Sequence, residues 1–315
     1  MNKILLSAVK PTGRPHIGNY FGAMKQFVDL QDKYDSRVFI ADFHAFTTTT
    51  DVKQIHEDII GVALDYLAIG LDPKKCLIFK QSDVPQVTEL CWLFDCITTM
   101  PYLMRAHAFK DGEAKNKDIS VGSFNYPMLM AADILMQDAN VVPVGQDQKQ
   151  HVEFARDTAE KFNRTFGETF VLPDALILEG LAVVPGTDGQ KMSKSYKNTI
   201  PLFATDEEIQ KAVMSIVTDS SGGVPKNVYA IHSLFRDKEY LDKLYDEKSG
   251  KYKDLKEALA EDVKNFIRPL REKRAELEKN LPEVLAILKE NGEKARTIAE
   301  VKMQDIRKKI GVSLY

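Results

Sequence analysis

Cysteine is scarce in this sequence: only Cys76, Cys91 and Cys96 occur among 315 residues. Three thiols cannot all pair with one another, and their spacing contains neither a CxxC pair nor a set of four metal ligands. The six histidines are scattered as well, without the close pairs that zinc sites use. We therefore expect buried free thiols in a reducing cytoplasm and no structural metal.

Long apolar runs and a large net charge are also lacking. The first apolar run, Ile4–Val9, stops at Lys10-Pro11, which is too early for a signal-peptide core, and no run approaches the about 20 residues of a membrane helix. The formal net charge is -3, so any contact with nucleic acid must come from a local basic patch. At 44% hydrophobic residues, the chain can bury a substantial core, and its length favours two domains.

Four apolar stretches have the length of a buried strand, and segments of helical period separate them. We predict strands over residues 4–9, 37–41, 76–81 and 140–145, and helices over 18–32, 51–70 and 127–136, with a further helix ending near Asn163. Because strands and helices alternate, the predicted fold class is α/β, with a Rossmann-type parallel sheet and right-handed crossovers.

The chain changes character after Lys197, where strand-like runs become rare and charged helical segments dominate. We predict a sheet domain over residues 1–199 and a helical domain over 200–315. Within the first domain, residues 101–125 are expected to form loop and short helix over a site. The modest excess of lysine and arginine after residue 251 fits a nucleic-acid surface and a solvated helical surface equally well.

Two distant stretches carry the candidate chemistry. Lys191–Ser195 combines two lysines and two serines behind a glycine-rich turn, which suits a loop that closes on phosphate, although a solvated basic loop has the same composition. Residues 11–19 follow the first strand, where parallel sheets bind ligands. There Gly13 and Gly18 let backbone approach a ligand, and a helix N-terminus beside His16 and Asn19 offers donors to phosphate.

Together the two stretches resemble the paired motifs of class I aminoacyl-tRNA synthetases. His16-Ile17-Gly18-Asn19 is similar to the HIGH signature, and Lys191–Ser195 is an unaltered KMSKS. The resemblance implies ATP binding and stabilisation of the α-phosphate while an amino-acid carboxylate attacks it and pyrophosphate leaves. Such transfers depend on positioning and charge stabilisation, which lysines on a closing loop supply.

Site residues follow from the same resemblance. The implied catalytic residues are Lys191, Lys194, Ser193, Ser195, His16 and Asn19. The implied ATP-binding residues are Lys10, Thr12, Gly13, Gly18, Asn19, Gly145, Asp147, Gln148, Val183, Val184, Lys191, Met192, Ser193, Lys194, Ser195 and Lys110, the last of which is equally well a surface lysine. Mg²⁺ is expected with the phosphates, with no dedicated protein ligands.

The amino acid is indicated by residues 126–136 and 145–153, which resemble bacterial tryptophanyl-tRNA synthetases. Asp133 lies inside an apolar helix and needs a buried partner: an internal salt bridge, or the indole N–H of tryptophan, which the resemblance favours. The implied tryptophan-binding residues are Asp133, Met130, Tyr126, Leu6, His44, Val142, Val144 and Gln148. A flat apolar slot would select the bicyclic ring, and phenylalanine would leave Asp133 unpaired.

The resemblance further implies tRNA(Trp) as partner, an anticodon-binding role for the helical domain and a homodimer. The apolar segment 93–104 suits an interface or the core. Lys10, Leu6 and Tyr196 depart from the usual residues of the family and leave the packing around the indole open. The alternatives are a tyrosyl-tRNA synthetase, a nucleotidyltransferase of cofactor biosynthesis and a catalytically silent RNA- or protein-binding paralogue.

Overall fold

A five-stranded parallel sheet forms the centre of the protein. The structure is a computed structural model that describes residues 2–114, 118–145, 148–177, 184–218 and 223–314. Its strands are β1 (Ile4–Val9), β2 (Asp35–Ile40), β3 (Cys76–Lys80), β4 (Val141–Pro143) and β5 (Asp174–Leu176), in the order β3-β2-β1-β4-β5. Every pair is parallel, and the predicted α/β class with a Rossmann-type sheet is confirmed.

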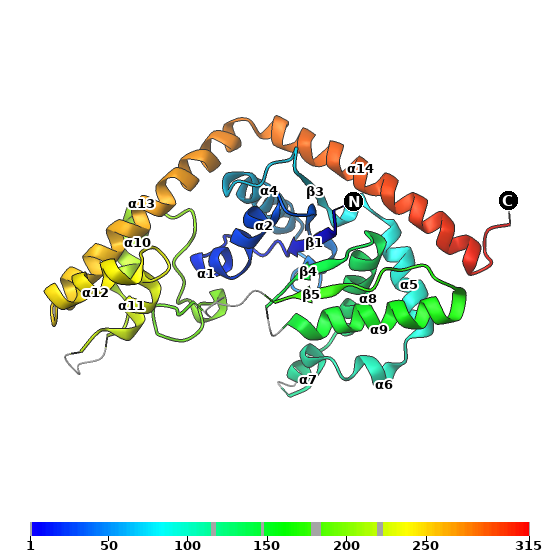
Figure 1. Cartoon of the computed structure of the whole chain (residues 1–315), viewed down its shortest axis with the longest axis horizontal. Helices are drawn as coiled ribbons and strands as arrows, with labels where there is room; N and C mark the ends of the chain where they lie inside the picture. The colour runs from blue at the N-terminus through cyan, green and yellow to red at the C-terminus, as the bar shows by residue number, and fades with distance from the viewer. Residues whose placement is uncertain (1, 115–117, 146–147, 178–183, 219–222, 315) are drawn as a thin grey trace.

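Helices cover both faces of this sheet (Figure 1). The helical segments up to residue 166 are α1 (Ile17–Asn19), a π-helical turn (Tyr20–Met24), α2 (Lys25–Leu30), α3 (Asp42–Ala45), α4 (Val52–Ala68), α5 (Gln86–Ile97), α6 (Met100–Leu103), α7 (His107–Ala114), α8 (Val121–Met136) and α9 (Lys149–Phe166). Side chains alternate between faces along β2: Val38 and Ile40 pack with α2 and α4, whereas Phe39 packs with α5 and α8. Each face therefore has its own apolar core.

One predicted helix start in this region was wrong, and α5 and β5 were not predicted. Helix α8 begins at Val121 and runs through Pro127, because the Ser120 hydroxyl accepts the Ser123 N–H at 3.2 Å and starts the helix one turn and a half earlier than the proline. The proline costs one internal hydrogen bond, and the burial of the following turns offsets it. Strand β5 was missed because it has three residues and lies at the sheet edge, where no long apolar run is needed.

The remaining helices are α10 (Asp206–Met214), α11 (Lys226–His232), α12 (Lys238–Glu247), α13 (Tyr252–Lys279) and α14 (Leu281–Lys309). In Figure 1, α13 and α14 form one long arm across the top of the molecule. The start of α13 packs on α10 and α11, whereas Ala299, Met303 and Ile306 of α14 join the core of α5 and α8. The boundary at residue 199 stays a prediction, and α14 belongs structurally to the sheet side.

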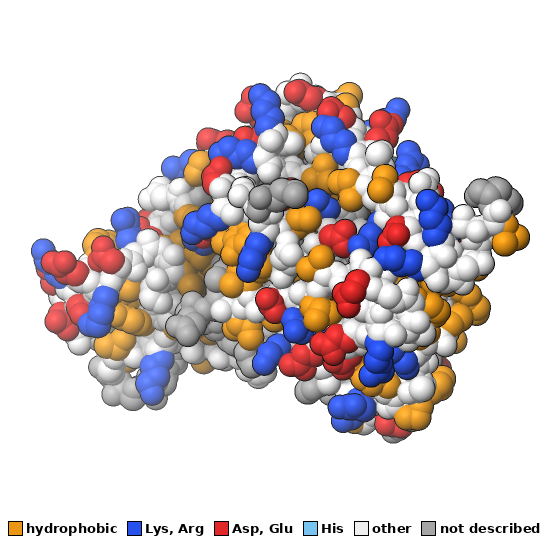
Figure 2. All heavy atoms as spheres, turned by 45° about the vertical axis from the view of Figure 1, so that its right-hand side comes forward, with side chains coloured by type: hydrophobic (Ala, Val, Ile, Leu, Met, Phe, Trp, Pro, Cys, Tyr) orange, Lys and Arg blue, Asp and Glu red, His pale blue; other side chains and the backbone are white. Residues whose placement is uncertain are grey.

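The surface carries mixed charge, as the small net charge requires. Figure 2 shows lysine and arginine interspersed with aspartate and glutamate over the visible face. Within the described ranges, each helix is too short or too polar to span a bilayer. Cys76 and Cys91 are buried free thiols as expected, but Cys96 is exposed because it lies on the outer face of α5 near its end, so that part of the prediction was wrong.

Candidate active site

The turn between β1 and α1 forms a corner that is fixed by hydrogen bonds between His16 and Asn19. Gly13 has φ +84°, a left-handed conformation that glycine adopts without a steric penalty. His16 caps α1: the Asn19 N–H donates to His16 Nδ1 at 3.2 Å, and the His16 N–H donates to Asn19 Oδ1 at 3.1 Å. This reciprocal pair fixes both side chains at the carboxyl end of the sheet.

His16 is held in its neutral form. Burial, followed by the charge of Lys194, lowers the pKa of His16 to about 4. Because Nδ1 accepts the Asn19 amide, the proton of the neutral ring resides on Nε2 and can be donated to an anion. A methyl group at Gly18 would lie 2.9 Å from His16 Nδ1, so glycine is needed for the ring to keep this position.

The KMSKS residues lie on a small hairpin with one organising side chain. The Met192 N–H donates to Val184 O at 2.9 Å, and Pro185 and Lys191 form an antiparallel bridge. Buried Asn198 accepts the Ser193 N–H at 2.8 Å and donates to Lys191 O at 3.1 Å. It also donates to Asp188 at 2.7 Å in the turn. Sequence reasoning missed Asn198, although a polar residue three positions after the motif was a usable signal.

The two stretches meet in space, as predicted, through backbone bonds of the residues just after KMSKS and through the Lys194 side chain. The Ile17 N–H donates to Ile200 O at 3.0 Å, and the Leu202 N–H donates to Pro15 O at 2.9 Å. The Lys194 ammonium donates to Thr12 O at 2.7 Å and Gly13 O at 3.0 Å. The KMSKS lysine is therefore already seated on the turn that would receive phosphate.

A cavity of about 490 Å³ lies at the ends of β1, β2 and β4, and it reaches the chain at Lys10, where the turn begins. All eight residues predicted to bind tryptophan line it: Leu6, His44, Tyr126, Met130, Asp133, Val142, Val144 and Gln148. Lys10 and Gly145 from the predicted ATP set line it as well, together with apolar Phe39 and Ile134, which sequence reasoning missed. The cavity is thus mainly apolar with a few polar groups, as small-molecule sites usually are.

Asp133 is the buried polar group of this cavity. It is 4% exposed, and burial raises its pKa. Gln81 Nε2 lies 2.9 and 2.8 Å from its two carboxylate oxygens, and His44 Nε2 lies 3.1 Å from Oδ2. Gln81 in turn accepts the Phe43 N–H at 3.0 Å. The predicted need for a buried partner is confirmed, but Gln81 itself was missed because it looked like the last residue of a strand.

Polar residues at the cavity rim form two further groups. Tyr126 Oη lies 2.5 Å from His151 Nε2, and His151 Nδ1 lies 2.7 Å from Gln148 Oε1. His151 was not among the predicted site residues and connects two that were. Lys10 donates to Thr47 Oγ1 at 2.8 Å and also to Thr48, and burial lowers its pKa. These groups surround the space that the polar end of an amino acid would occupy.

The structure does not bring every predicted residue together. Lys110 is exposed on α7, which Figure 1 shows well apart from α1, whereas the sequence placed it in a polar loop. Val184 and Met192, which pair with each other in the hairpin, have buried side chains, whereas Ser195 is exposed. Asp147 and Val183 lie outside the described residues.

These features define a class I tRNA synthetase site, and comparison with known families agrees. Residues 2–286 match the family described as tRNA synthetases class I (W and Y). The match extends over most of the chain, so the chain belongs to this family.

Within the family, several close relatives bear the name tryptophan–tRNA ligase. The chain is 50% identical to the tryptophan–tRNA ligase of Fusobacterium nucleatum, over 98% of this chain and 97% of that protein. It is 46% identical to the tryptophan–tRNA ligase of Rhodopirellula baltica, over 98% and 99%. A crystal structure of tryptophanyl-tRNA synthetase from Campylobacter jejuni, complexed with ADP and tryptophan, superimposes with a TM-score of 0.90 at 44% identity, covering 98% and 99% of the two chains.

Proposed function

We propose that this protein activates L-tryptophan with ATP and transfers it to tRNA(Trp), releasing pyrophosphate and AMP. The single observation that carries this proposal is the buried Asp133 carboxylate in an apolar cavity that is also lined by Lys10, the residue that leads into the HIGH-like turn. Relatives at 46–50% identity bear the name tryptophan–tRNA ligase, which supports the same substrate.

The chemistry of the first step matches the groups at the corner. The tryptophan carboxylate attacks the α-phosphorus of ATP, the bond to the bridging oxygen breaks, and pyrophosphate leaves with that electron pair. Charge gathers on the phosphate oxygens, where Lys191 and Lys194 supply cations and neutral His16 donates from Nε2. The amides of Ile17 and Asn19 at the start of α1 already donate to Ile200 O and to His16, and these bonds fix the turn that presents His16.

The cavity supplies the selectivity. Asp133 would accept the indole N–H, since its two donors, Gln81 and His44, leave lone pairs on the carboxylate. Leu6, Met130, Val142 and Val144 would pack on the ring faces. Tyr126, Gln148 and Lys10 would then meet the ammonium and carboxylate groups at the rim, where their polar atoms lie. Phenylalanine lacks a donor for Asp133 and would be rejected by roughly 10⁴ or more.

The nucleotide would be held by the remaining predicted residues: Thr12, Gly13, Gly18 and Asn19 of the turn, Gly145, Asp147 and Gln148 after β4, and residues 183–184 and 191–195 around the hairpin. Mg²⁺ would enter with the phosphates. Among the described residues, no three His, Cys, Asp or Glu side chains form a metal cage. Lys110 would contact pyrophosphate only if α7 moved towards the corner.

Three further assignments complete the proposal: the enzyme acts in the cytoplasm, works as a homodimer and uses the helices after residue 200 to bind the anticodon. Segment 93–104 supports the dimer, because the side chains of Met100 and Met104 are exposed, whereas Leu103 of the same segment packs in the core. Trp92, immediately before it, is 68% exposed. Exposed large apolar side chains in one stretch are typical of a protein interface.

Amino-acid-dependent ATP–pyrophosphate exchange with each of the twenty amino acids tests the proposal. We expect exchange with tryptophan alone. Exchange with tyrosine alone would identify the tyrosyl alternative. The absence of exchange with all twenty would favour a nucleotidyltransferase or a silent binding paralogue and would overturn the proposed reaction.

A further inference from the structure

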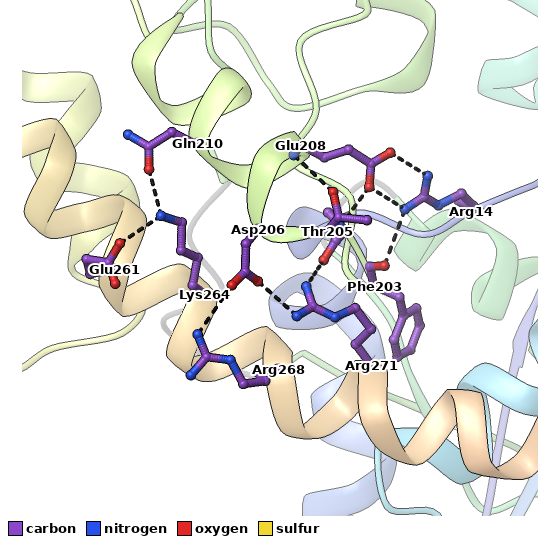
Figure 3. Close-up of polar contacts among 11 residues, drawn as sticks. Arg14, Phe203, Thr205, Asp206, Glu208, Gln210, Glu261, Lys264, Arg268 and Arg271 are labelled. Carbon is purple, nitrogen blue, oxygen red and sulfur yellow. Dashed lines mark hydrogen bonds and ion pairs between the residues drawn. The ribbon is translucent and has the colours of Figure 1, made fainter.

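Arg14 joins the nucleotide corner to the helices that follow the KMSKS hairpin. Its guanidinium donates to both carboxylate oxygens of Glu208 on α10, at 3.0 and 3.2 Å, and to Phe203 O at 3.3 Å. The two charged residues are 194 positions apart in sequence. Figure 3 shows Arg14 reaching from the turn towards the first residues of α10. A bidentate pair of this kind fixes orientation as well as distance.

Glu208 is itself held in place by the start of α10. Its N–H donates to Thr205 Oγ1 at 3.2 Å, and its carboxylate accepts the Thr205 N–H at 2.8 Å. The pair with Arg14, and then the Thr205 amide, lowers the pKa of Glu208, so the carboxylate is ionised at neutral pH. Arg14 therefore binds a carboxylate that cannot swing away without breaking the cap of α10.

Helix α10 is in turn fixed to α13 by a second set of ion pairs. Asp206 accepts Arg271 at 2.8 Å and Arg268 at 3.3 Å, and Arg271 also donates to Ala204 O. Figure 3 shows the contacts of Arg14 with Glu208 and those of Asp206 with Arg271 and Arg268 as two neighbouring sets at the start of α10. The turn 11–16 is thus connected through α10 to the long helical arm.

The same turn carries the KMSKS lysine. Thr12 O and Gly13 O, immediately before Arg14, accept the Lys194 ammonium. An isolated exposed ion pair contributes about 0–1 kcal/mol to stability, so the pair of Arg14 with Glu208 adds little to the free energy of unfolding. Its effect on position is a different matter, because a shift of about 1 Å near a reacting centre can lower a rate about 100-fold.

We propose that Arg14 is a positioning residue for amino-acid activation: by anchoring turn 11–16 on α10, it holds Thr12 and Gly13 where Lys194 and ATP meet. The inference rests on the proposed function for its kinetic consequence. It assigns Arg14 no contact with substrate. Its removal should weaken the nucleotide corner and leave the tryptophan cavity as it is, since Arg14 does not line that cavity.

The test measures ATP–pyrophosphate exchange at saturating tryptophan with ATP varied, for Arg14→Ala, Glu208→Gln and the double variant. Glu208→Gln keeps an amide oxygen for the cap of α10 but loses the charge. We expect each single variant to lower kcat/KM for ATP about 5- to 20-fold, with KM for tryptophan changed less than about twofold. The double variant should be no worse than the poorer single variant, because both changes break the same link.

Arg156→Ala is the matched control. Arg156 pairs with Asp174 at 2.8 Å and donates to Pro173 O at 2.9 Å, the same two kinds of partner as Arg14, but beside β5. The Arg156→Ala variant should show the wild-type rate of ATP–pyrophosphate exchange. Wild-type kinetics in Arg14→Ala, or additive losses in the double variant, would overturn the positioning role.

A readout without activity separates this inference from the proposed function. Amide hydrogen exchange of residues 11–17 should speed up in Arg14→Ala and stay unchanged in Arg156→Ala. Unaltered amide hydrogen exchange in residues 11–17 would refute the anchoring role of Arg14, whatever the pyrophosphate-exchange kinetics show. A wild-type protein without tryptophan-dependent pyrophosphate exchange would instead refute the proposed reaction, while the hydrogen-exchange result still decides the anchor.

Discussion

At the residue scale, the buried carboxylate of Asp133 is the feature on which substrate choice depends. We predict that Asp133→Asn raises the KM for tryptophan roughly 10- to 100-fold, because a hydrogen bond to a charged group is worth about 1.5–3 kcal/mol. The amide preserves the shape of the side chain, which is buried between Gln81 and His44. Steady-state exchange with tryptophan varied measures the effect. An unchanged KM would mean that Asp133 only organises the cavity wall.

Gly18 gives a second prediction at this scale. Gly18→Ala should lower kcat/KM for ATP about 100-fold. The new methyl group would lie 2.9 Å from the His16 ring and would displace it. A positioned side chain that donates a proton or hydrogen bond to the reacting group typically contributes about 100-fold or more to the rate. Gly22→Ala is the matched control, since nothing lies within 4 Å of a Cβ at that position. Equal exchange rates in the two variants would contradict the role of His16.

Single residues differed in how well the sequence identified them. Asp133 was predictable because a lone carboxylate in an apolar helix requires a reason. Gln81 and His151 were not, because a glutamine at a strand end and a histidine on an amphipathic helix have many ordinary explanations. Their roles come from partners 52 and 25 positions away, which only the tertiary fold brings close.

At the element scale, the KMSKS hairpin depends on Asn198 as its internal brace. Asn198→Ala removes hydrogen bonds from its side chain to Ser193, Lys191 and Asp188. We predict a fall in kcat for exchange of about tenfold or more, with little change in the KM for tryptophan, because the lysines lose their fixed position. Varying tryptophan and ATP separately gives both constants. A rise in tryptophan KM alone would contradict this account.

The elements themselves were predictable where apolar period was strong. β1, β2 and β3 are long and buried, and α4 begins one residue after its predicted start, with Asp51 as its cap. The failures have local causes: three-residue β5 carries too little pattern, and Ser120 starts α8 ahead of Pro127, a residue that usually marks a helix start.

At the scale of the whole molecule, the long helical arm is tied to the sheet by the buried ion pair of Asp65 and Arg274, 2.6 Å apart. Burial outweighs the pair and raises the pKa of Asp65 from 3.8 to about 6. Between these values the unfolded chain has lost the proton that the folded protein keeps. The contribution of Asp65 to the free energy of unfolding is therefore largest below about pH 4 and falls as the pH rises to about 6.

Asp65→Asn tests this linkage, because the amide does not titrate. Relative to the variant, the wild-type protein should lose on the order of 2 kcal/mol of unfolding free energy as pH rises from 4 to 6, and then run parallel above pH 6. Urea unfolding at fixed ionic strength measures both curves. The weakened contact to Arg274 lowers the unfolding free energy of the variant by the same amount at every pH, so the difference in slope between the two curves is unaffected. Parallel curves throughout the range would show that Asp65 is ionised in the folded protein at acid pH.

The central claim concerns the complete reaction of the whole chain, which no single residue or element performs. Aminoacylation by the full-length protein, with ATP, each of the two candidate amino acids and purified tRNA(Trp) or tRNA(Tyr), tests it most directly. The account predicts that tryptophan alone is charged, only onto tRNA(Trp), with one AMP and one pyrophosphate released per charged tRNA. Tyrosine charged onto tRNA(Tyr), or no charging of either tRNA, would contradict it.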